Sequence, residues 1–249
     1  SENRRRSKIS RPLPYSTLRV CEVRKKVVDK TRTTKDNNLP SPSILMIVQK
    51  EEKMFKVGII TDQISMDFGY ALKVINGLGV KYIEIHSLWN KTIENLTVDE
   101  ATRAQKLIEK YSLQVSNISS TLFLMCHLQE SETELESFDD HFITKSGDYR
   151  EHMRALEYCI KLCEIFATDK IRIFGFRKKK SLNDDTVVKM VIQRLQQPVE
   201  LAEKTGITLI LENCPHTYLG SGSLTRRVID EVNSKNLKGL WDPGNALRT

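Results

Sequence analysis

The sequence lacks the cysteine pattern of secreted and zinc-finger proteins. Its five cysteines among 249 residues include no Cys-x-x-Cys pair and no short disulfide framework, and its five histidines are scattered. These absences argue against a disulfide scaffold and a zinc finger, and they favour a reducing, cytoplasmic location. No apolar run approaches the ~18 residues of a membrane span, so no membrane association is predicted.

Excess positive charge is also absent from most of the chain. Residues 1–50 contain 13 Lys/Arg against 4 Asp/Glu, whereas the remaining residues contain 26 against 28. The net charge of +7 therefore comes from the N-terminal fifth. A nucleic-acid partner inferred from overall charge would depend on this segment alone, so we do not expect one.

Residues 1–50 differ in amino-acid composition from the rest of the chain and are predicted to be a disordered basic leader. They are rich in Arg, Lys, Ser, Thr, Asn and Pro, a composition that rarely buries a core. Three explanations remain open: a transit-like peptide, a nucleic-acid-binding arm, or upstream sequence translated from a wrongly chosen start. We favour the last, because Met46 and Met54 both stand just before the first expected strand.

From residue 55 a repeating unit begins, in which short apolar runs alternate with helical periodicity. Thr97 and Glu100 have the spacing of a capping box, and Pro198 predicts a kink or a break in its helix. The expected strands are residues 55–61, 81–86, 113–120, 169–175, 206–211 and 237–241. The expected helices are residues 67–77, 97–111, 149–166, 184–204 and 224–233.

This alternation predicts parallel strands joined by right-handed crossovers, an arrangement found in doubly wound sheets and in (β/α)8 barrels. The first strand is followed by Thr61-Asp-Gln and not by a glycine-rich fingerprint, which argues against a dinucleotide fold. Eight units of about 31 residues would match the usual barrel size. We therefore expect an α/β (β/α)8 TIM barrel, with units one to six of eight in residues 54–249 and truncation after the sixth strand.

Two of the predicted strands end on a carboxylate, Glu212 and Asp242. Acidic residues are poor strand formers, and the carboxyl ends of parallel strands are where ligands and metals are held. Neighbouring strands lie about 5 Å apart, so two such carboxylates can share one hard cation. Two simpler explanations remain: Glu212 could pair with a neighbouring Arg, and Asp242 could be a turn residue before Pro243.

These segments resemble a known family. The runs Gly58-Ile-Ile-Thr, Tyr82-Ile-Glu-Ile, Ile171-Arg-Ile-Phe-Gly, Leu211-Glu-Asn and Leu240-Trp-Asp-Pro-Gly-Asn-Ala are similar to those of xylose isomerase-like TIM barrels. This sugar phosphate isomerase/epimerase superfamily also includes the endonuclease IV type of apurinic-site nuclease. The resemblance extends over about residues 55–246.

The resemblance implies a metal-dependent isomerase or epimerase that moves a proton on a sugar, sugar phosphate or polyol. One divalent ion (Mn, Mg, Zn or Co) is expected, with Glu212 and Asp242 as ligands and Glu212 also as an acid/base group. The family completes the site with a His and a Glu on strands seven and eight, which this sequence does not contain. We therefore expect the 249-residue chain, taken alone, to be catalytically impaired.

The resemblance also suggests substrate contacts. Asn245 stands where related nucleases carry the zinc-binding His of an Asp-x-x-His motif. Because Asn is a poor zinc ligand, this difference favours a one-metal sugar enzyme over a nuclease. Asn245 is then expected to contact the substrate. Asn213, His86 and His216 are further candidates, although His216 could equally be a surface residue. Buried Arg172 is expected to form an internal ion pair.

Two other functions remain open. One is an endonuclease IV-like nuclease, which would need a histidine-rich zinc cluster. The other is a non-catalytic barrel fragment that acts as a binding module. The expected partner in the favoured case is a small sugar, and the oligomeric state stays open, with a homo-oligomer as one option.

Overall fold

The computed structural model divides the chain into two units, Ser1–Phe55 and Lys56–Thr249. Within the second unit the structure describes residues 56–129, 142–179 and 181–248. The predicted leader, and the part of the long connection after the third strand that covers residues 130–141, lie outside the described residues.

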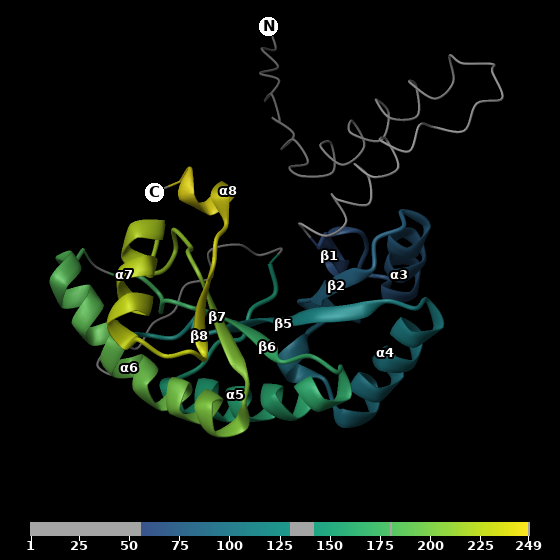
Figure 1. Cartoon of the computed structure of the whole chain (residues 1–249), viewed down its shortest axis with the longest axis horizontal. Helices are drawn as coiled ribbons and strands as arrows, with labels where there is room; N and C mark the ends of the chain where they lie inside the picture. Colours follow the sequence, from purple (N-terminus) through teal and green to yellow (C-terminus); the bar gives the residue numbers. More distant parts are fainter. Residues whose placement is uncertain (1–55, 130–141, 180, 249) are drawn as a thin grey trace, which may run out of the picture. The chain divides into compact units, whose positions relative to one another are not determined.

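Six strands form one fully parallel sheet, with the order β1-β2-β5-β6-β7-β8 (Figure 1). Each strand pairs with its neighbour in the chain order, as in a TIM barrel, whereas a doubly wound sheet reverses its order at a switch point. The barrel-type topology predicted from the sequence is therefore confirmed. The strands are β1 (Gly58–Ile60), β2 (Tyr82–Ile85), β5 (Gln114–Leu122), β6 (Lys170–Phe174), β7 (Thr208–Glu212) and β8 (Leu237–Leu240).

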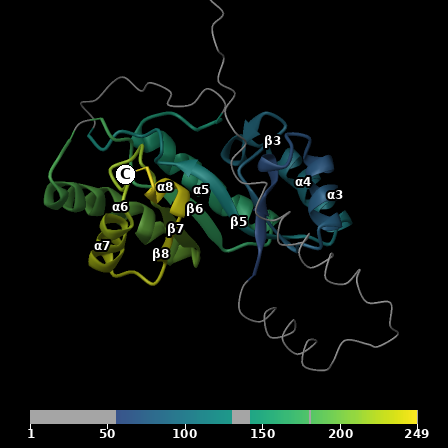
Figure 2. The same cartoon turned by 90° about the horizontal axis from the view of Figure 1, so that it is seen from above.

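Five helices connect these strands and cover one face of the sheet (Figures 1 and 2). A polar side chain caps the start of each helix by accepting a backbone N–H, including the predicted capping box of Thr97 and Glu100. The helices are α3 (Phe68–Gly77), α4 (Val98–Lys110), α5 (Tyr149–Ile165), α6 (Asp184–Thr205) and α7 (Gly222–Val232). Within the part of the chain that the structure describes, no helix is both long and apolar enough to cross a membrane.

Helix α6 runs through Pro198 as one helix, so of the two predicted alternatives, a kink or a break into two helices, the break is wrong. Proline has no N–H to donate to the carbonyl four residues earlier, which here belongs to Arg194. The hydroxyl of Tyr149 on α5 donates to that carbonyl at 2.7 Å. A neighbouring helix thus supplies the hydrogen bond that Pro198 cannot make.

Short elements that periodicity did not predict complete the unit. A hairpin of β3 (Ser87–Leu88) and β4 (Lys91–Thr92) follows β2, and its turn places Trp89 and Asn90 at positive φ. Single turns η1 (Thr61–Gln63), η2 (Ile93–Asn95) and α8 (Pro243–Ala246) follow β1, β4 and β8. Runs this short carry too few residues to show a helical or strand period.

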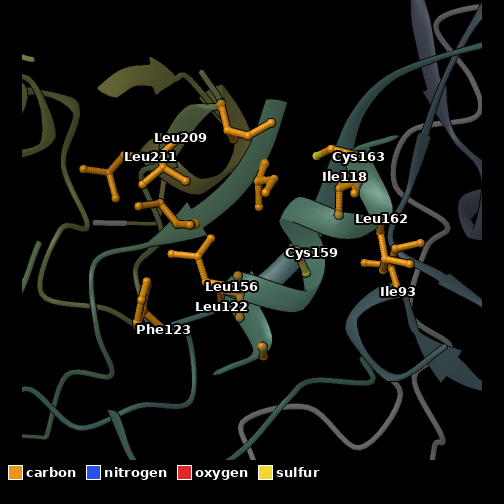
Figure 3. Packing of buried hydrophobic residues seen from close by; sticks show 14 of the residues in the cluster. Ile93, Ile118, Leu122, Phe123, Leu156, Cys159, Leu162, Cys163, Leu209 and Leu211 are labelled. Atoms are coloured by element: carbon orange, nitrogen blue, oxygen red, sulfur yellow. The ribbon is translucent and has the colours of Figure 1, made fainter. Parts of the chain in front are cut away.

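Side chains alternate between two faces along each strand. Leu209 and Leu211 of β7 are fully buried against the helices, in the same core as Cys159 and Cys163 of α5 (Figure 3). These two cysteines are therefore small core residues. On the opposite face β7 presents Glu212. We call the face of the sheet that carries Glu212 the interior face.

Candidate active site

Glu212 ends β7 on the interior face, level with Phe174 of β6 and Leu240 of β8 in the strand register. Only 5% of the residue is exposed. Its Oε1 atom accepts a hydrogen bond from Nδ2 of Asn245 at 3.1 Å. Its Oε2 atom lies 3.2 Å from Nη1 of Arg172. The predicted carboxylate is therefore buried and held from two sides.

Arg172 lies on β6 and is the internal ion-pair residue that the sequence predicted. Its Nη2 and Nε atoms donate to the carbonyl oxygens of Ser119 and Ser120 on β5, at 2.9 and 3.1 Å. Its contact with Glu212 is an ion pair without the alignment of a hydrogen bond, and Oε2 of Glu212 makes no hydrogen bond in the described residues. The alternative in which Glu212 pairs with an Arg thus describes the contacts seen in this structure.

The surroundings of Glu212 raise the pKa of its carboxyl group above the ordinary value. Burial is the largest cause, and the negative charges of Asp242 and Glu84 act in the same direction. The guanidinium of Arg172 opposes them and favours the ionised form. A carboxyl group with a raised pKa holds a proton more readily than an exposed glutamate, a property that general acid/base catalysis uses.

Asp242 follows β8 and caps the short helix α8, where its Oδ1 atom accepts the backbone N–H of Asn245 at 2.9 Å. Its own backbone is fixed by the side-chain amide of Asn213, which accepts from the Asp242 N–H at 2.8 Å and donates to the Asp242 carbonyl at 3.0 Å. Asp242 is therefore a turn residue, as the simpler alternative proposed, and Asn213 positions it. Substrate contact by Asn213 stays a prediction.

Asn245 joins the two carboxylates. Its backbone N–H reaches Asp242, its Nδ2 reaches Glu212, and the same Nδ2 donates to the Asn213 carbonyl at 3.0 Å. An Asn at this position therefore holds the two acidic side chains at one end of the sheet. Its predicted contact with substrate is untested.

His86 lies beyond β2 and is 3% exposed. Its Nδ1 atom is 2.6 Å from Oδ2 of Asp62, its Nε2 atom is 3.1 Å from the Ile143 carbonyl, and its ring stacks on Phe142. Although burial favours the neutral acid, the contacts with His86 and Ser87 hold the pKa of Asp62 below its ordinary value. Asp62 was not among the candidate site residues that the sequence predicted. Its position immediately after the first strand could have indicated that it lies at the carboxyl end of the sheet.

His216 belongs to the loop after β7 and is partly exposed. Its carbonyl accepts hydrogen bonds from the backbone N–H of Lys178 at 3.0 Å and from Nη1 of Arg177 at 3.4 Å. The loops after β6 and β7 are thereby joined. The structure does not bring His216 or His86 into hydrogen-bond contact with Glu212, and their predicted substrate contacts stay predictions.

The carboxylate oxygens of Glu212 and Asp242 meet part of what a divalent cation needs from its ligands. Glu212 offers Oε2, a buried oxygen without a hydrogen bond, and the hydrogen bonds of Asp242 in the described residues reach only Oδ1. Oxygen ligands of this kind match hard divalent cations. Among the residues that the structure describes, no group of three or more His, Cys, Asp or Glu side chains could hold a metal. Glu212 and Asp242 thus offer two oxygens that fit a divalent cation, and the charge of Arg172 opposes the binding of a cation beside Glu212.

The parallel strand order and the acidic residues at adjacent strand ends define a TIM-barrel protein with its candidate site at the carboxyl end of the sheet. A family model, the xylose isomerase-like TIM barrel, matches residues 72–249, more than half of the chain. The chain belongs to this family. No curated protein matches the chain significantly.

Solved structures show the same fold at low identity. The probable 3-DHS dehydratase AsbF of Bacillus anthracis is 19% identical, with a TM-score of 0.54 over 78% of this chain and 65% of that one. A xylose isomerase-like TIM barrel protein from Mycobacterium smegmatis, in complex with magnesium, is 14% identical, with a TM-score of 0.57 over 79% and 67%. A D-psicose 3-epimerase from Clostridium cellulolyticum, solved with D-tagatose, is 12% identical, with a TM-score of 0.54 over 77% and 64%. The chain therefore spans about two thirds of these structures.

Proposed function

We propose that this chain is a metal-assisted isomerase or epimerase, with Glu212 and Asp242 in its site and a keto sugar, sugar phosphate or polyol as substrate. The observation that carries the proposal is the joining of Glu212 and Asp242 through Asn245 at the ends of adjacent parallel strands. Family membership supports it, because the structural neighbours include epimerases.

In this proposal Glu212 and Asp242 would hold one divalent ion, which when bound supplies polarisation of a substrate carbonyl or hydroxyl. Glu212 removes a proton from the carbon beside that carbonyl. Burial, which raises the pKa of this carboxyl group, makes it a stronger base than an exposed glutamate. Asn245 and Arg172 keep the Glu212 side chain in one orientation during the transfer.

The structural neighbours guide the choice of metal and test substrate. One is described in complex with magnesium, another with a zinc atom, and a D-psicose 3-epimerase was solved in the presence of D-fructose. D-Fructose is therefore a reasonable first probe. A cytoplasmic location remains part of the proposal.

A second candidate is a non-catalytic barrel that uses the same surface for binding. The ion pair favours it, because Arg172 already neutralises Glu212. A nuclease is less favoured, because the amide of Asn245 contacts Glu212 at the position where a zinc-binding histidine would be needed. The two leading candidates differ in whether the site takes up a metal and moves a proton.

The test is conversion of D-fructose to D-psicose by the full chain, with and without Mn²⁺, followed by mass spectrometry and NMR over long incubations. We expect slow, metal-dependent conversion that is lost in Glu212→Gln. Glu157→Gln, which changes an exposed carboxylate on α5, is the matched control and should behave as the unaltered chain. Conversion that does not depend on metal, or that survives in Glu212→Gln, would contradict the proposal.

A further inference from the structure

Residues 142–146 cross the carboxyl end of the sheet, and we call them the strap. The ring of Phe142 stacks on the ring of His86, which follows β2, with the ring centroids 4.5 Å apart and the ring planes 3° from parallel. Phe142 also packs against a small buried cluster at or just after the ends of β5, β6 and β7, made of Leu124, Met125, Phe174 and Cys214. The strap therefore links the end of β2 to this cluster.

The apolar cluster adjoins the candidate site. Phe174 is level with Glu212 in the strand register, and the guanidinium of Arg172 lies 5.0 Å from the centroid of the Phe174 ring. Cys214 stands two residues after Glu212 and is 6% exposed. By packing on this cluster, the strap comes to lie beside the region that holds Glu212.

The two ends of the strap are held by different kinds of contact. At the end nearest α5, the backbone N–H of Lys145 donates to Oγ1 of Thr121 at 2.8 Å, and Ser146 forms a β-bridge with the segment that follows β5. At the other end, the Ile143 carbonyl lies 3.1 Å from Nε2 of His86. Backbone contacts to β5 thus fix one end, and the side chain of His86 holds the other.

His86 is itself fixed in one orientation. Its Nδ1 atom lies 2.6 Å from Oδ2 of Asp62, and the same oxygen accepts the hydroxyl of Ser87 at 2.5 Å. The side chains of His86 and Asp62 are only 4% and 12% exposed. Because a carbonyl oxygen accepts hydrogen bonds and donates none, Nε2 is the donor in the contact with Ile143. Asp62 therefore orients the His86 ring so that its Nε2–H points at the strap.

The strap has the features of a segment that opens locally. Its residues, all of which the structure describes, form no helix and only one β-bridge, and each is partly or largely exposed. Gly147 follows the strap at φ +146°, a conformation that favours glycine, and a Cβ atom there would lie 2.5 Å from Oε2 of Glu151. Segments with few buried contacts open at a low cost in free energy, and residues at their ends take up the backbone rotation.

We propose that the strap opens and closes beside Glu212, with residues 145–147 as its hinge and His86 as its latch. In the closed arrangement of this structure, the latch keeps Phe142 on the apolar cluster. Release of the Ile143 carbonyl from His86 lets Phe142 leave the cluster and opens the site from that side. The strap controls access for any ligand, so this inference goes beyond the proposed function and does not depend on it. His86 acts through the strap and is a positioning residue.

Two buried cysteines report on opening without any assay of activity. Cys214 belongs to the cluster under Phe142, so a thiol reagent should reach it when the strap opens. Cys159 is fully buried in the core beneath the helices, in the other cluster, so it should react only when the whole fold opens. The ratio of the two alkylation rates therefore separates local opening from unfolding.

Three variants test the latch. Asp62→Asn/His86→Phe keeps an aromatic ring against Phe142 but has no donor for the Ile143 carbonyl, and the change at Asp62 avoids an unpaired buried carboxylate. Phe142→Leu keeps an apolar side chain on the cluster and removes the ring stack. Ser146→Ala changes an exposed side chain on the same strap and is the matched control.

The experiment treats the full chain and each variant with iodoacetamide and follows alkylation of each cysteine by peptide mass spectrometry. We expect Cys214 to react about fivefold faster in Asp62→Asn/His86→Phe and in Phe142→Leu, since losing one hydrogen bond or one ring stack shifts a local opening equilibrium by about this factor. Ser146→Ala should stay within about twofold of the unaltered chain, as expected for an exposed position. Cys159 should react at the same slow rate in all four proteins.

Two results would overturn the proposal. Equal rates at Cys214 in all four proteins would show that neither the latch nor the ring stack controls access beside Glu212. A rise at Cys159 that matches the rise at Cys214 would show that the thiols become accessible through unfolding of the whole fold and not through the strap.

Discussion

Arg172 places its Nη1 atom 3.2 Å from Oε2 of Glu212, and both side chains are 7% exposed. A buried ion pair of this kind contributes little when intact but leaves an expensive unpaired charge when one partner is removed. The pair therefore explains how an acidic residue is tolerated at the end of a buried strand. It also means that any cation bound by Glu212 must share this carboxylate with Arg172.

Removing the guanidinium of Arg172 should show how far the stability of the fold depends on its ion pair with Glu212. Arg172→Met is expected to reduce the free energy of unfolding at neutral pH by about 3–5 kcal/mol, because Glu212 loses its counter-charge and two β5 carbonyls lose their donor. Urea unfolding measures the change. The double variant Arg172→Met/Glu212→Gln should be less destabilised than the single variant, since the buried charge is gone. Equal destabilisation of both variants would contradict the account of this pair.

The hydrogen bond from the Tyr149 hydroxyl to the Arg194 carbonyl should stabilise α6 at Pro198. Burial raises the pKa of Tyr149 to about 12, so its hydroxyl stays a donor at neutral pH. Tyr149→Phe should reduce stability by about 1–2 kcal/mol, because it leaves that carbonyl without a partner. In a Pro198→Ala background the new backbone N–H can serve the carbonyl, so the same substitution should matter less. A loss of equal size in both backgrounds would show that the hydroxyl does not compensate for Pro198.

His152 should make the fold sensitive to acid. Burial is the main cause that lowers its pKa from 6.5 to about 4, with a further contribution from the nearby charge of Lys145 that Asp148 partly opposes. A group whose pKa is depressed by folding stabilises the protein above its unfolded pKa and loses that contribution as pH falls. The shift from 6.5 to about 4 corresponds to about 3 kcal/mol.

Urea unfolding between pH 7 and pH 4 measures this loss. His152→Asn keeps an acceptor for the backbone N–H of Phe123, which donates to the Nδ1 atom of His152 at 3.1 Å, and has no group that titrates in this range. We expect the stability of the unaltered chain to fall more steeply than that of the variant by about 3 kcal/mol at pH 4. Parallel curves would mean that His152 is not buried as a neutral ring.

Two glycines offer a matched comparison of packing. A Cβ atom at Gly175, after β6, would lie 2.5 Å from Cγ of Leu219, whereas one at Gly77 in α3 would meet nothing within 4 Å. Gly175→Ala should therefore destabilise the fold by about 1–3 kcal/mol through overpacking. Gly77→Ala should be neutral or stabilise it by up to about 1 kcal/mol, because alanine restricts the unfolded chain. Similar thermal unfolding of the two variants would contradict the close approach at Gly175.

The sequence predicted the repeating units because their signals are local: each strand or helix shows its own period, and the capping box of Thr97 and Glu100 spans one turn. It also predicted an internal ion pair for Arg172, since a buried guanidinium needs a counter-charge. The contacts it missed join distant positions. Asp62 and His86 are 24 residues apart, and Glu212 and Asn245 are 33 apart. Such pairs depend on which side chains meet at the ends of the strands, and periodicity does not report these contacts.

The most direct test of the central claim, that Glu212 and Asp242 form a divalent metal site, is a Mn²⁺ titration of the full chain followed by calorimetry. We expect one ion per chain with a dissociation constant on the order of 10⁻⁴ to 10⁻³ M, the weak end for carboxylate sites. Binding should weaken by about tenfold or more in Glu212→Gln and in Asp242→Asn, and should be unchanged in Glu157→Gln. Binding of equal strength in all four proteins, or no binding in any of them, would contradict the claim.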